Sequence, residues 1–423
     1  QVVTELFKKN DLSHIKVRFK KRIQNKGLIL ILNFLKIIYV IFNSWLFSRL
    51  SPRELPQGEI ILVDTFMFKE SIDRSGNFED RYYTGHQKYL SSKEKENIWY
   101  VPTLFGLKKP QDYLKVFMRS HKCLDNLLIK ESWLSFYDYL TAMLYSFRAS
   151  SEVTIIPKFR GIDVTPIIHK ELREDRGSLS VFRALCNYAF YKRISLEGIK
   201  ISFVINWFEN HVNDRALNLS IRKYFKNVYI KGYQGFFLID YYATYEPTEL
   251  EYDLGTVPDE INVINEYCHG KIKKQCPKVK INLSPAFRFD HLGEVRDRRS
   301  KDTKNIFIPF PGEGMTARGV NLVKNCLSVV TGLNDSVKLY VKPHPSFPEE
   351  LLKKYDKVML NEDITFTTNN TASMYEISDV VVATGSVVCV ESVSLGIPTA
   401  ISGNSPEVTM NPIPIDFRPD IWK

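Results

Sequence analysis

Short apolar runs alternate with longer amphipathic segments along most of the chain from residue 57 onwards. The run at residues 59–66 (EIILVDTF) is typical of a buried parallel strand, whereas residues 177–193 show helical spacing. Strands that alternate with helices predict a mostly parallel sheet covered on both faces. The strands expected in the first half are residues 59–66, 98–102, 153–156, 199–206, 228–230, 260–263 and 280–284, and the helices are residues 133–146, 177–193 and 214–224.

A second α/β unit follows the charged stretch at residues 294–304 (EVRDRRSKDTK), which is expected to be an interdomain linker. The pattern therefore predicts an α/β protein in which two Rossmann-like domains face a cleft. Its strands are expected at residues 305–309, 337–341, 378–383 and 399–401, and its helices from 317 to about 330 and from 386 to about 395. The predicted divisions are an N-terminal arm (1–56), a first domain (57–297), a second domain (298–404) and a C-terminal tail (405–423), for which a return to the first domain is one possibility.

The arm contains an apolar stretch at residues 27–47 that is long enough, at about 20 residues, to cross a bilayer. On a helix its polar residues and those just before it fall within an arc of about 100°. A narrow basic stripe beside a wide apolar face favours a helix that lies in a membrane interface. Packing on the body or on a second subunit, and true spanning, remain as alternatives. The polar residues of the arc are Arg22, Lys26, Asn33, Lys36, Asn43 and Ser44.

Charge is concentrated in the same arm. The chain has 423 residues and a formal net charge of +10, and its first 50 residues hold ten Lys or Arg against Glu5 and Asp11. A cation near an anionic lipid surface contributes about 1 kcal/mol, so this arm predicts an anionic membrane surface as a partner. No nucleic-acid partner is expected, because the cations flank an apolar helix and do not line an aromatic-rich groove.

The cysteines bear on the compartment and on metal binding. All six stand apart without a CxxC pair, which is typical of reduced thiols in the cytosol and argues against a zinc site. The apolar segment begins late and no small-residue cleavage site follows it, so a signal peptide is not expected. Together with the arm, these features predict a cytoplasmic protein, peripheral at the inner face of the cytoplasmic membrane.

Two segments of the second half carry candidate chemistry, VKPHP at residues 341–345 and SDVVVATGSVVCVESVSLGIPTAI at residues 378–401. Gly385 and Ser386 stand where a strand turns into a helix, so free N–H groups and the helix dipole provide an anion site. His344 is held between two prolines and could bind a phosphate as a cation or protonate a leaving group. The further candidates for donor binding are Lys342, which would add charge, Glu391 on the following helix, and the turn Gly312, Glu313 and Gly314.

The two segments together resemble the nucleotide-binding half of GT-B glycosyltransferases. The His-Pro pair is most similar to that of bacterial transferases that use CMP-activated acidic sugars, namely sialyl-, polysialyl- and Kdo transferases. A looser similarity extends to GYQG at residues 232–235, VPDEINVINEY at 257–267 and SPAFRF at 284–289. The resemblance covers roughly residues 59–401. It implies that Glu391 takes the ribose hydroxyls and that the first domain presents the acceptor and the base.

In the first domain a polar group follows the strand expected at residues 199–206. Glu209 is the first choice for the base that takes the proton of an acceptor hydroxyl. The lower-ranked substrate-binding candidates are Asn210 and His211 beside it, Gln234 and Arg288 for a donor carboxylate, and Asp64 at the end of the first strand.

The sequence therefore predicts a glycosyltransferase that moves an acidic sugar, Kdo or another nonulosonate, from a CMP donor to a lipid-linked or growing surface glycan. No metal and no cofactor besides the nucleotide sugar are expected, because a helix terminus and His344 would stabilise the leaving group. One alternative is a GT-B transferase that uses a UDP- or GDP-sugar or a polyol-phosphate donor. Another is a non-catalytic membrane scaffold. The linkage and the choice between inversion and retention are left open.

Overall fold

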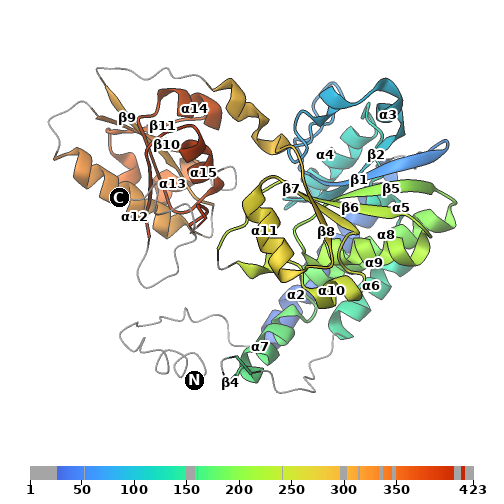
Figure 1. Ribbon diagram of the computed structural model, residues 1–423. Coiled ribbons are helices and arrows are strands. Elements are labelled where there is room, and N and C mark those ends of the chain that lie inside the picture. The colour runs from blue at the N-terminus through green and yellow to red at the C-terminus, as the bar shows by residue number, and fades with distance from the viewer. Residues whose placement is uncertain are drawn as a thin grey trace. The chain divides into compact units, whose positions relative to one another are not determined.

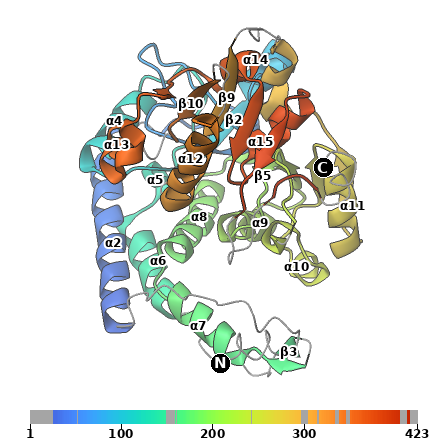
Figure 2. The same ribbon diagram turned by 90° about the vertical axis from the view of Figure 1, so that its left-hand side faces the viewer.

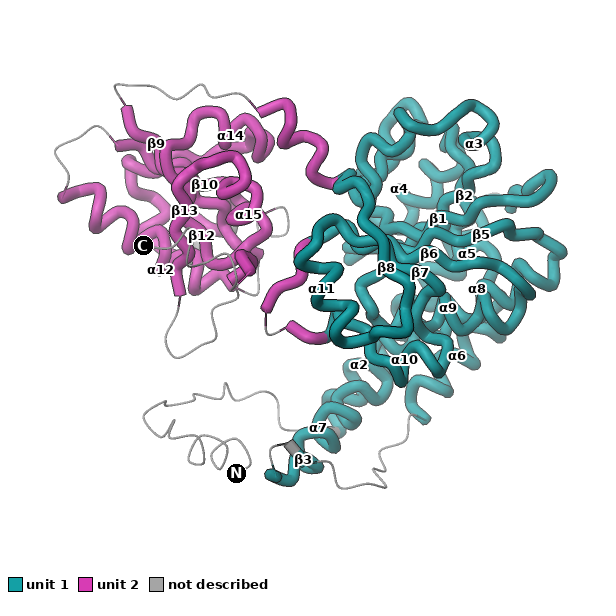
Figure 3. The backbone as a smooth tube through the Cα atoms, viewed as in Figure 1, with its two compact units in different colours: residues 1–236, 244–287 teal, residues 237–243, 288–423 magenta. Residues whose placement is uncertain are grey.

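The computed structural model describes residues 26–51, 53–148, 158–159, 161–240, 242–295, 303–312, 315–332, 337–344, 349–403 and 411–414. The chain divides into two compact units, residues 1–236 with 244–287, and residues 237–243 with 288–423 (Figure 3). The predicted domain boundary between residues 297 and 298 lies outside the described residues, as do most of the predicted linker, residues 1–25 of the arm and nearly all of the tail.

Six parallel strands form the sheet of the first unit (Figure 1). They are β1 (Glu59–Met67), β2 (Ile98–Leu104), β5 (Lys200–Trp207), β6 (Tyr229–Gln234), β7 (Glu260–Val263) and β8 (Lys280–Leu283). Their spatial order is β2-β1-β5-β6-β7-β8. Strand β2 lies on one side of β1 and all later strands lie on the other side, so the direction of strand addition reverses between β1 and β5. A short antiparallel pair, β3 (Lys158–Phe159) and β4 (Ile162–Asp163), stands apart from this sheet.

Helices cover the sheet and extend the first unit beyond it (Figure 2). The apolar residues of β1, β2 and β5 pack with those of α6 and α8 in one core cluster, to which Ile37 and Ile41 of α2 also belong. The helices of this unit are α2 (Lys26–Phe47), α3 (Ser92–Asn97), α4 (Pro110–Ser120), α5 (Lys130–Trp133), α6 (Phe136–Arg148), α7 (Thr165–Asp175), α8 (Leu179–Leu196), α9 (Val212–Tyr224), α10 (Glu249–Asp253) and α11 (Glu266–Gln275).

The second unit has a five-stranded parallel sheet in the order β11-β10-β9-β12-β13. Consecutive residues of β9 point to opposite faces, so Phe307 joins a core beneath α14 while Ile308 joins another beneath α12. Gly319 lets α12 approach this sheet, because a Cβ there would stand 2.6 Å from Phe310. The elements are β9 (Lys304–Pro309), α12 (Thr316–Val330), β10 (Val337–Lys342), α13 (Glu349–Tyr355), β11 (Ile364–Phe366), α14 (Thr371–Ile377), β12 (Val380–Ala383), α15 (Val387–Ser394) and β13 (Thr399–Ile401).

The α/β class with two Rossmann-like sheets is confirmed, and most predicted strands agree with observed ones within two or three residues at each end. Strand β11 was not predicted, because its three residues alternate apolar and polar without a longer apolar run. The helix predicted at residues 133–146 is two helices, since the backbone of Leu134 is extended between α5 and α6. The strand predicted at residues 153–156 lies outside the described residues.

Candidate functional site

The strand order locates a candidate site at the carboxyl edge of the first sheet. In open α/β sheets ligands bind beyond the carboxyl ends of the strands, at the point where strand addition reverses direction. In the first unit that point lies between β1 and β5. Asp64 lies on β1, and Glu209 follows the last residue of β5, Trp207, by two positions.

Glu209 is held by two neighbouring side chains. The Trp207 indole Nε1 donates to Glu209 Oε1 at 2.7 Å, and His211 Nε2 lies 3.1 Å from Glu209 Oε2. The hydrogen bond to Glu209 raises the pKa of His211. Both carboxylate oxygens of Glu209 are therefore oriented, and its side chain remains half-buried. A carboxylate fixed in this way at a sheet edge is suited to accept a proton.

Asp214 fixes the backbone of the same loop and was not predicted as a site residue. Its Oδ2 accepts from the backbone N–H of Glu209 at 2.9 Å and from that of His211 at 3.0 Å. Burial, together with the nearby Asp64 carboxylate, raises the pKa of Asp214 to about 7. In the sequence Asp214 is visible only as an acid in the first turn of a predicted helix. Acids are common there because they stabilise the start of a helix, so this position did not indicate a site residue.

Asn210 and Gln234 are almost fully buried and contact one turn of backbone. The Asn210 Nδ2 donates to the carbonyl of Thr244 at 3.1 Å, and the Gln234 Nε2 donates to that of Tyr245 at 3.1 Å. Asn210 also has a positive φ of 56°, a conformation that asparagine tolerates better than most residues. In this geometry both amides hold the turn Ala243–Tyr245, and Asn210 ties that turn to the loop of Glu209. Their direct contact with a substrate stays a prediction.

Asp64 is also internal. Its Oδ1 lies 3.3 Å from the Nζ of Lys130, which donates to the Thr103 hydroxyl at 2.8 Å. Burial raises the pKa of Asp64 despite this ion pair, and the neighbouring Asp80 contributes in the same direction. Arg288, by contrast, is exposed at the start of a 3-10 helix (Phe287–Glu294) and is grouped with the second unit.

Aromatic rings surround the Trp207 side chain. The ring centroid of Tyr82 lies 4.6 Å from that of Trp207, and those of Tyr83 and Tyr233 lie at 5.7 and 5.6 Å. Gly235 is required for this packing, because a Cβ there would stand 2.5 Å from Tyr233 and 2.8 Å from Trp207. The cluster holds the indole that orients Glu209.

In the second unit strand addition reverses between β9 and β12, and candidate residues follow both strands. Gly312 comes after β9, while Gly385 and Ser386 come after β12. Gly385 has a φ of 99°, and the Ser386 hydroxyl caps α15 by accepting from the N–H of Val388 at 3.3 Å. A hydroxyl that accepts at a helix start can still donate its own proton to an anion. Glu313 and Gly314 lie outside the described residues.

Glu391, one and a half turns into α15, accepts a hydrogen bond from the Tyr375 hydroxyl at 2.5 Å. The pKa of Tyr375 is raised by burial and by this carboxylate, so the phenol stays protonated and donates. One oxygen of Glu391 is thereby held toward α14. The contact of Glu391 with ribose hydroxyls stays a prediction.

His344 and Lys342 belong to β10 and the residues after it. His344 is exposed, and partial burial of its ring lowers its pKa. Lys342 Nζ donates to the carbonyl of Asn369, and burial lowers the pKa of Lys342. Because β9, β10 and β12 are parallel, His344 and Ser386 follow the same edge of one sheet, with β9 between their strands.

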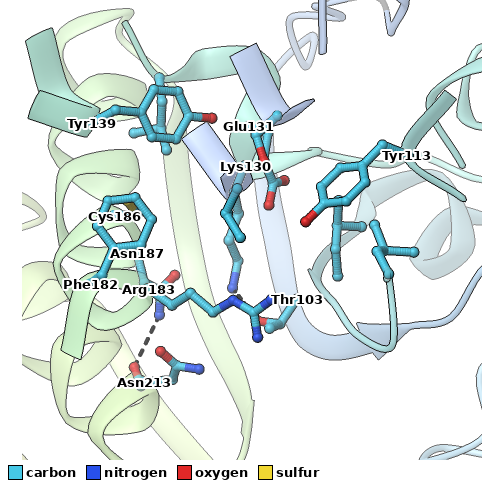
Figure 4. A pocket seen from close by; sticks show the side chains of 15 residues that line it. Thr103, Tyr113, Lys130, Glu131, Tyr139, Phe182, Arg183, Cys186, Asn187 and Asn213 are labelled. Atoms are coloured by element: carbon cyan, nitrogen blue, oxygen red, sulfur yellow. Dashed lines mark hydrogen bonds between the residues drawn. The ribbon is translucent and has the colours of Figure 1, made fainter. Parts of the chain in front are cut away.

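A separate cavity lies inside the first unit between α2, α6, α8 and the end of β2 (Figure 4). Its volume of about 50 Å³ accommodates about four water molecules, which is too little for a nucleotide sugar. Tyr139, Asn187, Asn213 and Glu131 each present a buried polar atom without a protein partner among the described residues. Buried water is the usual partner of such atoms.

Among the described residues there is no group of three or more His, Cys, Asp or Glu side chains that could hold a metal ion. The expectation that no metal takes part therefore stays a prediction.

No family model and no curated protein matches the chain. A structure from Listeria monocytogenes, assigned as a UDP-N-acetylglucosamine 2-epimerase, is 13% identical over 82% of this chain and 79% of that one, with a TM-score of 0.44. The S. aureus MnaA–UDP structure is 11% identical over 82% and 79%, with a TM-score of 0.42. An α,α-trehalose 6-phosphate synthase from Burkholderia multivorans is 10% identical over 82% and 83%, with a TM-score of 0.39.

Scores this low carry no inference about the activity of this chain. The class therefore follows from the strand orders of the chain itself. It is an α/β protein built of two Rossmann-like domains, the class to which the predicted GT-B fold belongs.

Proposed function

We propose that the chain is a glycosyltransferase that moves an acidic sugar, Kdo or another nonulosonate, from a CMP-activated donor to a lipid-linked or growing surface glycan. In this reaction an acceptor hydroxyl oxygen bonds to the anomeric carbon of the sugar, and the bond from that carbon to the CMP phosphate oxygen breaks. CMP leaves with the electron pair, and the hydroxyl proton passes to the enzyme's base.

The geometry of Glu209 is the observation that carries this proposal. Its two oxygens are oriented by Trp207 and His211, and its backbone is fixed by Asp214. It lies at the reversal point of a parallel sheet, where substrates of such sheets bind. We assign Glu209 as the base that receives the acceptor proton.

The donor phosphate is assigned to the second unit. Ser386 and the first N–H groups of α15 would receive its oxygens, because the start of a helix attracts negative charge. His344 and Lys342 supply further donors from β10, and Gly312 and Gly385 let the backbone approach. Glu391 is assigned to the ribose. No metal and no other cofactor is required in this scheme, since these groups stabilise the charge of departing CMP.

The proposed location is the inner face of the cytoplasmic membrane. Helix α2 is long and apolar enough to cross a membrane by length and composition. In the structure Ile37, Asn43 and Ser44 are buried, while most of the remaining apolar side chains of the helix point outward. The predicted polar stripe thus turns partly toward the protein. We propose a helix that packs on the first unit and meets an anionic membrane with its other face.

A donor screen tests the activity. We expect CMP to raise the thermal midpoint of the full chain, and CMP-Kdo or CMP-sialate with a glycan acceptor to release nucleotide. Stabilisation and turnover with UDP- or GDP-sugars alone would instead support the alternative GT-B transferase.

Substitution of the assigned base separates an enzyme from a non-catalytic scaffold. A scaffold would keep its cellular role in the E209Q and H344A variants, whereas a transferase would lose turnover and remain folded. We favour the enzyme because Trp207 and His211 each hold one oxygen of the Glu209 carboxylate. A scaffold would not need a carboxylate oriented in this way.

A further inference from the structure

Helix α2 exposes an apolar face along its whole length. Ile37 and Ile41 anchor the opposite face in the core. Side chains about 38–60% exposed lie along the outer face, namely Leu28, Ile31, Leu32, Leu35, Ile38, Phe42 and Leu46. A helix whose polar residues Asn43 and Ser44 are buried while its leucines face outward is not arranged for contact with water.

Helix α6 lies beside α2 (Figure 2). The rings of Phe34 and Phe147 lie 6.2 Å apart, and those of Trp45 and Phe136 also lie 6.2 Å apart. The end of α6 thus meets the middle of α2 and its beginning meets the end of α2, so the two helices are antiparallel. The exposed apolar residues of α6 are Phe136, Tyr137, Leu140, Leu144 and Tyr145.

A hollow of about 580 Å³ opens where α2 ends and α6 begins. Among the described residues that line it there are two arginines and no carboxylate. The guanidinium of Arg49 stacks on the Trp45 ring at 4.3 Å and makes no ion pair with a described residue. Arg53 uses its Nε to bond the carbonyl of Ser132 at 2.5 Å, which leaves its two terminal nitrogens without a partner among the described residues. The other residues that line the hollow are Ser48, Ser51, Leu134, Ser135 and Phe136.

The charges around this surface are nearly all positive. Helix α2 contains no acid, and the one acid of α6, Asp138, is paired with Arg193 at 2.8 Å. The acid next to the hollow along the chain, Glu54, is exposed and does not line it. Lys36 and Arg148 add exposed cations toward the other end of the helix pair.

We infer that a phospholipid docks on this surface, with its phosphate between Arg49 and Arg53 and its acyl chains along the outer faces of α2 and α6. Guanidinium groups bind phosphate in a forked geometry, and a 580 Å³ hollow has room for a head group. This inference rests on the proposed membrane location and extends it from the arm to α6, which lies outside the predicted arm.

A second copy of the chain is the competing occupant of the same face. It would bring cations against cations with no unpaired acid on either helix to oppose them. The segment that leads into α2, residues 1–25, carries seven Lys or Arg against two acids. An anionic lipid surface complements both regions, so charge favours the membrane.

Binding of the full chain to vesicles of phosphatidylglycerol and phosphatidylcholine tests the phosphate site. We expect the R49Q/R53Q variant to bind about 30-fold more weakly, at about 1 kcal/mol for each cation. The matched control, R74Q/R173Q, removes the same charge at two other exposed positions and is expected to bind like the wild type. Equal loss in both variants would overturn the site and leave only general attraction of charge.

A second pair of variants tests the apolar face. We expect L140Q/L144Q on α6 to lower binding at least tenfold to both anionic and neutral vesicles. The control L250Q/L254Q, which changes two exposed leucines at the same spacing on α10 and its C-cap, is expected to have no effect. Light scattering with size exclusion distinguishes the competing occupant. A wild-type dimer that L140Q/L144Q converts to a monomer without a change in vesicle binding would overturn the inference.

Two further measurements distinguish lipid phosphate from free phosphate, and the docking inference from the proposed transferase activity. The first adds 10 mM inorganic phosphate to wild-type protein bound to vesicles. If phosphate lowers binding as much as the R49Q/R53Q substitution does, the site binds free phosphate, and lipid docking is overturned. Nucleotide release with a soluble acceptor is expected to be unchanged in all four variants. A chain with no transferase activity would still show the vesicle results, so the two failures are distinguishable.

Discussion

At the scale of single residues, Glu209 and its three neighbours form a unit that couples two elements. Trp207 ends β5, Asp214 lies in the first turn of α9, and the loop between them carries Glu209 and His211. Glu209 and His211 were predicted from their place after an apolar strand. Asp214 was missed because a carboxylate in the first turn of a helix is read as a cap, and its burial is visible only in the folded chain.

The E209Q variant tests the assigned base. Glutamine keeps the hydrogen bond from Trp207 but cannot take a proton, so we expect turnover to fall about 10²- to 10⁴-fold with little change in the thermal midpoint. Glu171 is exposed on α7 and provides the matched control E171Q. Full turnover by E209Q would remove the base from this position.

Asp214 predicts a particular dependence of stability on pH. Its folded pKa of about 7 lies above the ordinary value of 3.8, so between these values the folded state holds more protons than the unfolded state. The contribution of this group to stability is therefore greatest below about pH 4 and is lost as the pH rises to about 7.

Comparison with D214N isolates that contribution. Urea unfolding from pH 4.5 to 7.5 should show the stability of the wild type relative to D214N falling with pH, by at most about 1.4 kcal/mol per pH unit. Parallel curves for the two proteins would show that Asp214 does not titrate in this range.

At the scale of elements, the second unit places a glycine and a serine at a strand-to-helix junction, as the sequence predicted. This prediction succeeded because the turn and the helix cap depend on neighbouring residues only. The pairing of Glu391 with Tyr375 was not foreseen, since it joins α15 to α14 across 16 positions of sequence. The left-handed conformation of Asn210 was likewise not predicted, as nothing in its neighbours requires it.

The S386A variant separates capping from ligand binding. Removal of an N-cap hydroxyl costs about 1 kcal/mol of stability, and the same loss is expected for S178A, where Ser178 caps α8 by accepting from Val181 at 3.2 Å. Only S386A should also weaken CMP binding, by roughly tenfold, because its hydroxyl is assigned to the phosphate. Equal CMP affinity in the two variants, measured by calorimetry, would place the phosphate elsewhere.

At the scale of the whole molecule, the basic segment and the helix that follows it have separable roles. Residues 1–25 hold most of the cations of the arm, whereas α2 completes the core of the first unit through Ile37 and Ile41. The sequence left packing on the body open as one alternative for the apolar stretch. Helix α2 does pack there, so its removal would expose buried side chains of the body.

Two truncations test this division. Deletion of residues 1–25 should weaken binding to anionic vesicles, keep the thermal midpoint and keep turnover with a soluble acceptor. Deletion of residues 1–50 should also lower stability, by about 1.5–3 kcal/mol for each of Ile37 and Ile41. Equal stability of the two truncated proteins, measured by urea unfolding, would mean that α2 does not support the core.

The sequence by itself determined the features that depend on neighbours along the chain. Apolar runs defined β1 and β5, the 3.6-residue period defined the amphipathic α2, and Gly385-Ser386 marked a helix start. The tertiary structure alone decided which distant residues meet. Asp64 pairs with Lys130, Asn210 bonds the Thr244 backbone, and α6 lies beside α2. These contacts follow from strand order and helix packing, which periodicity does not encode, because the same pattern of apolar residues is compatible with many orders of strands in a sheet.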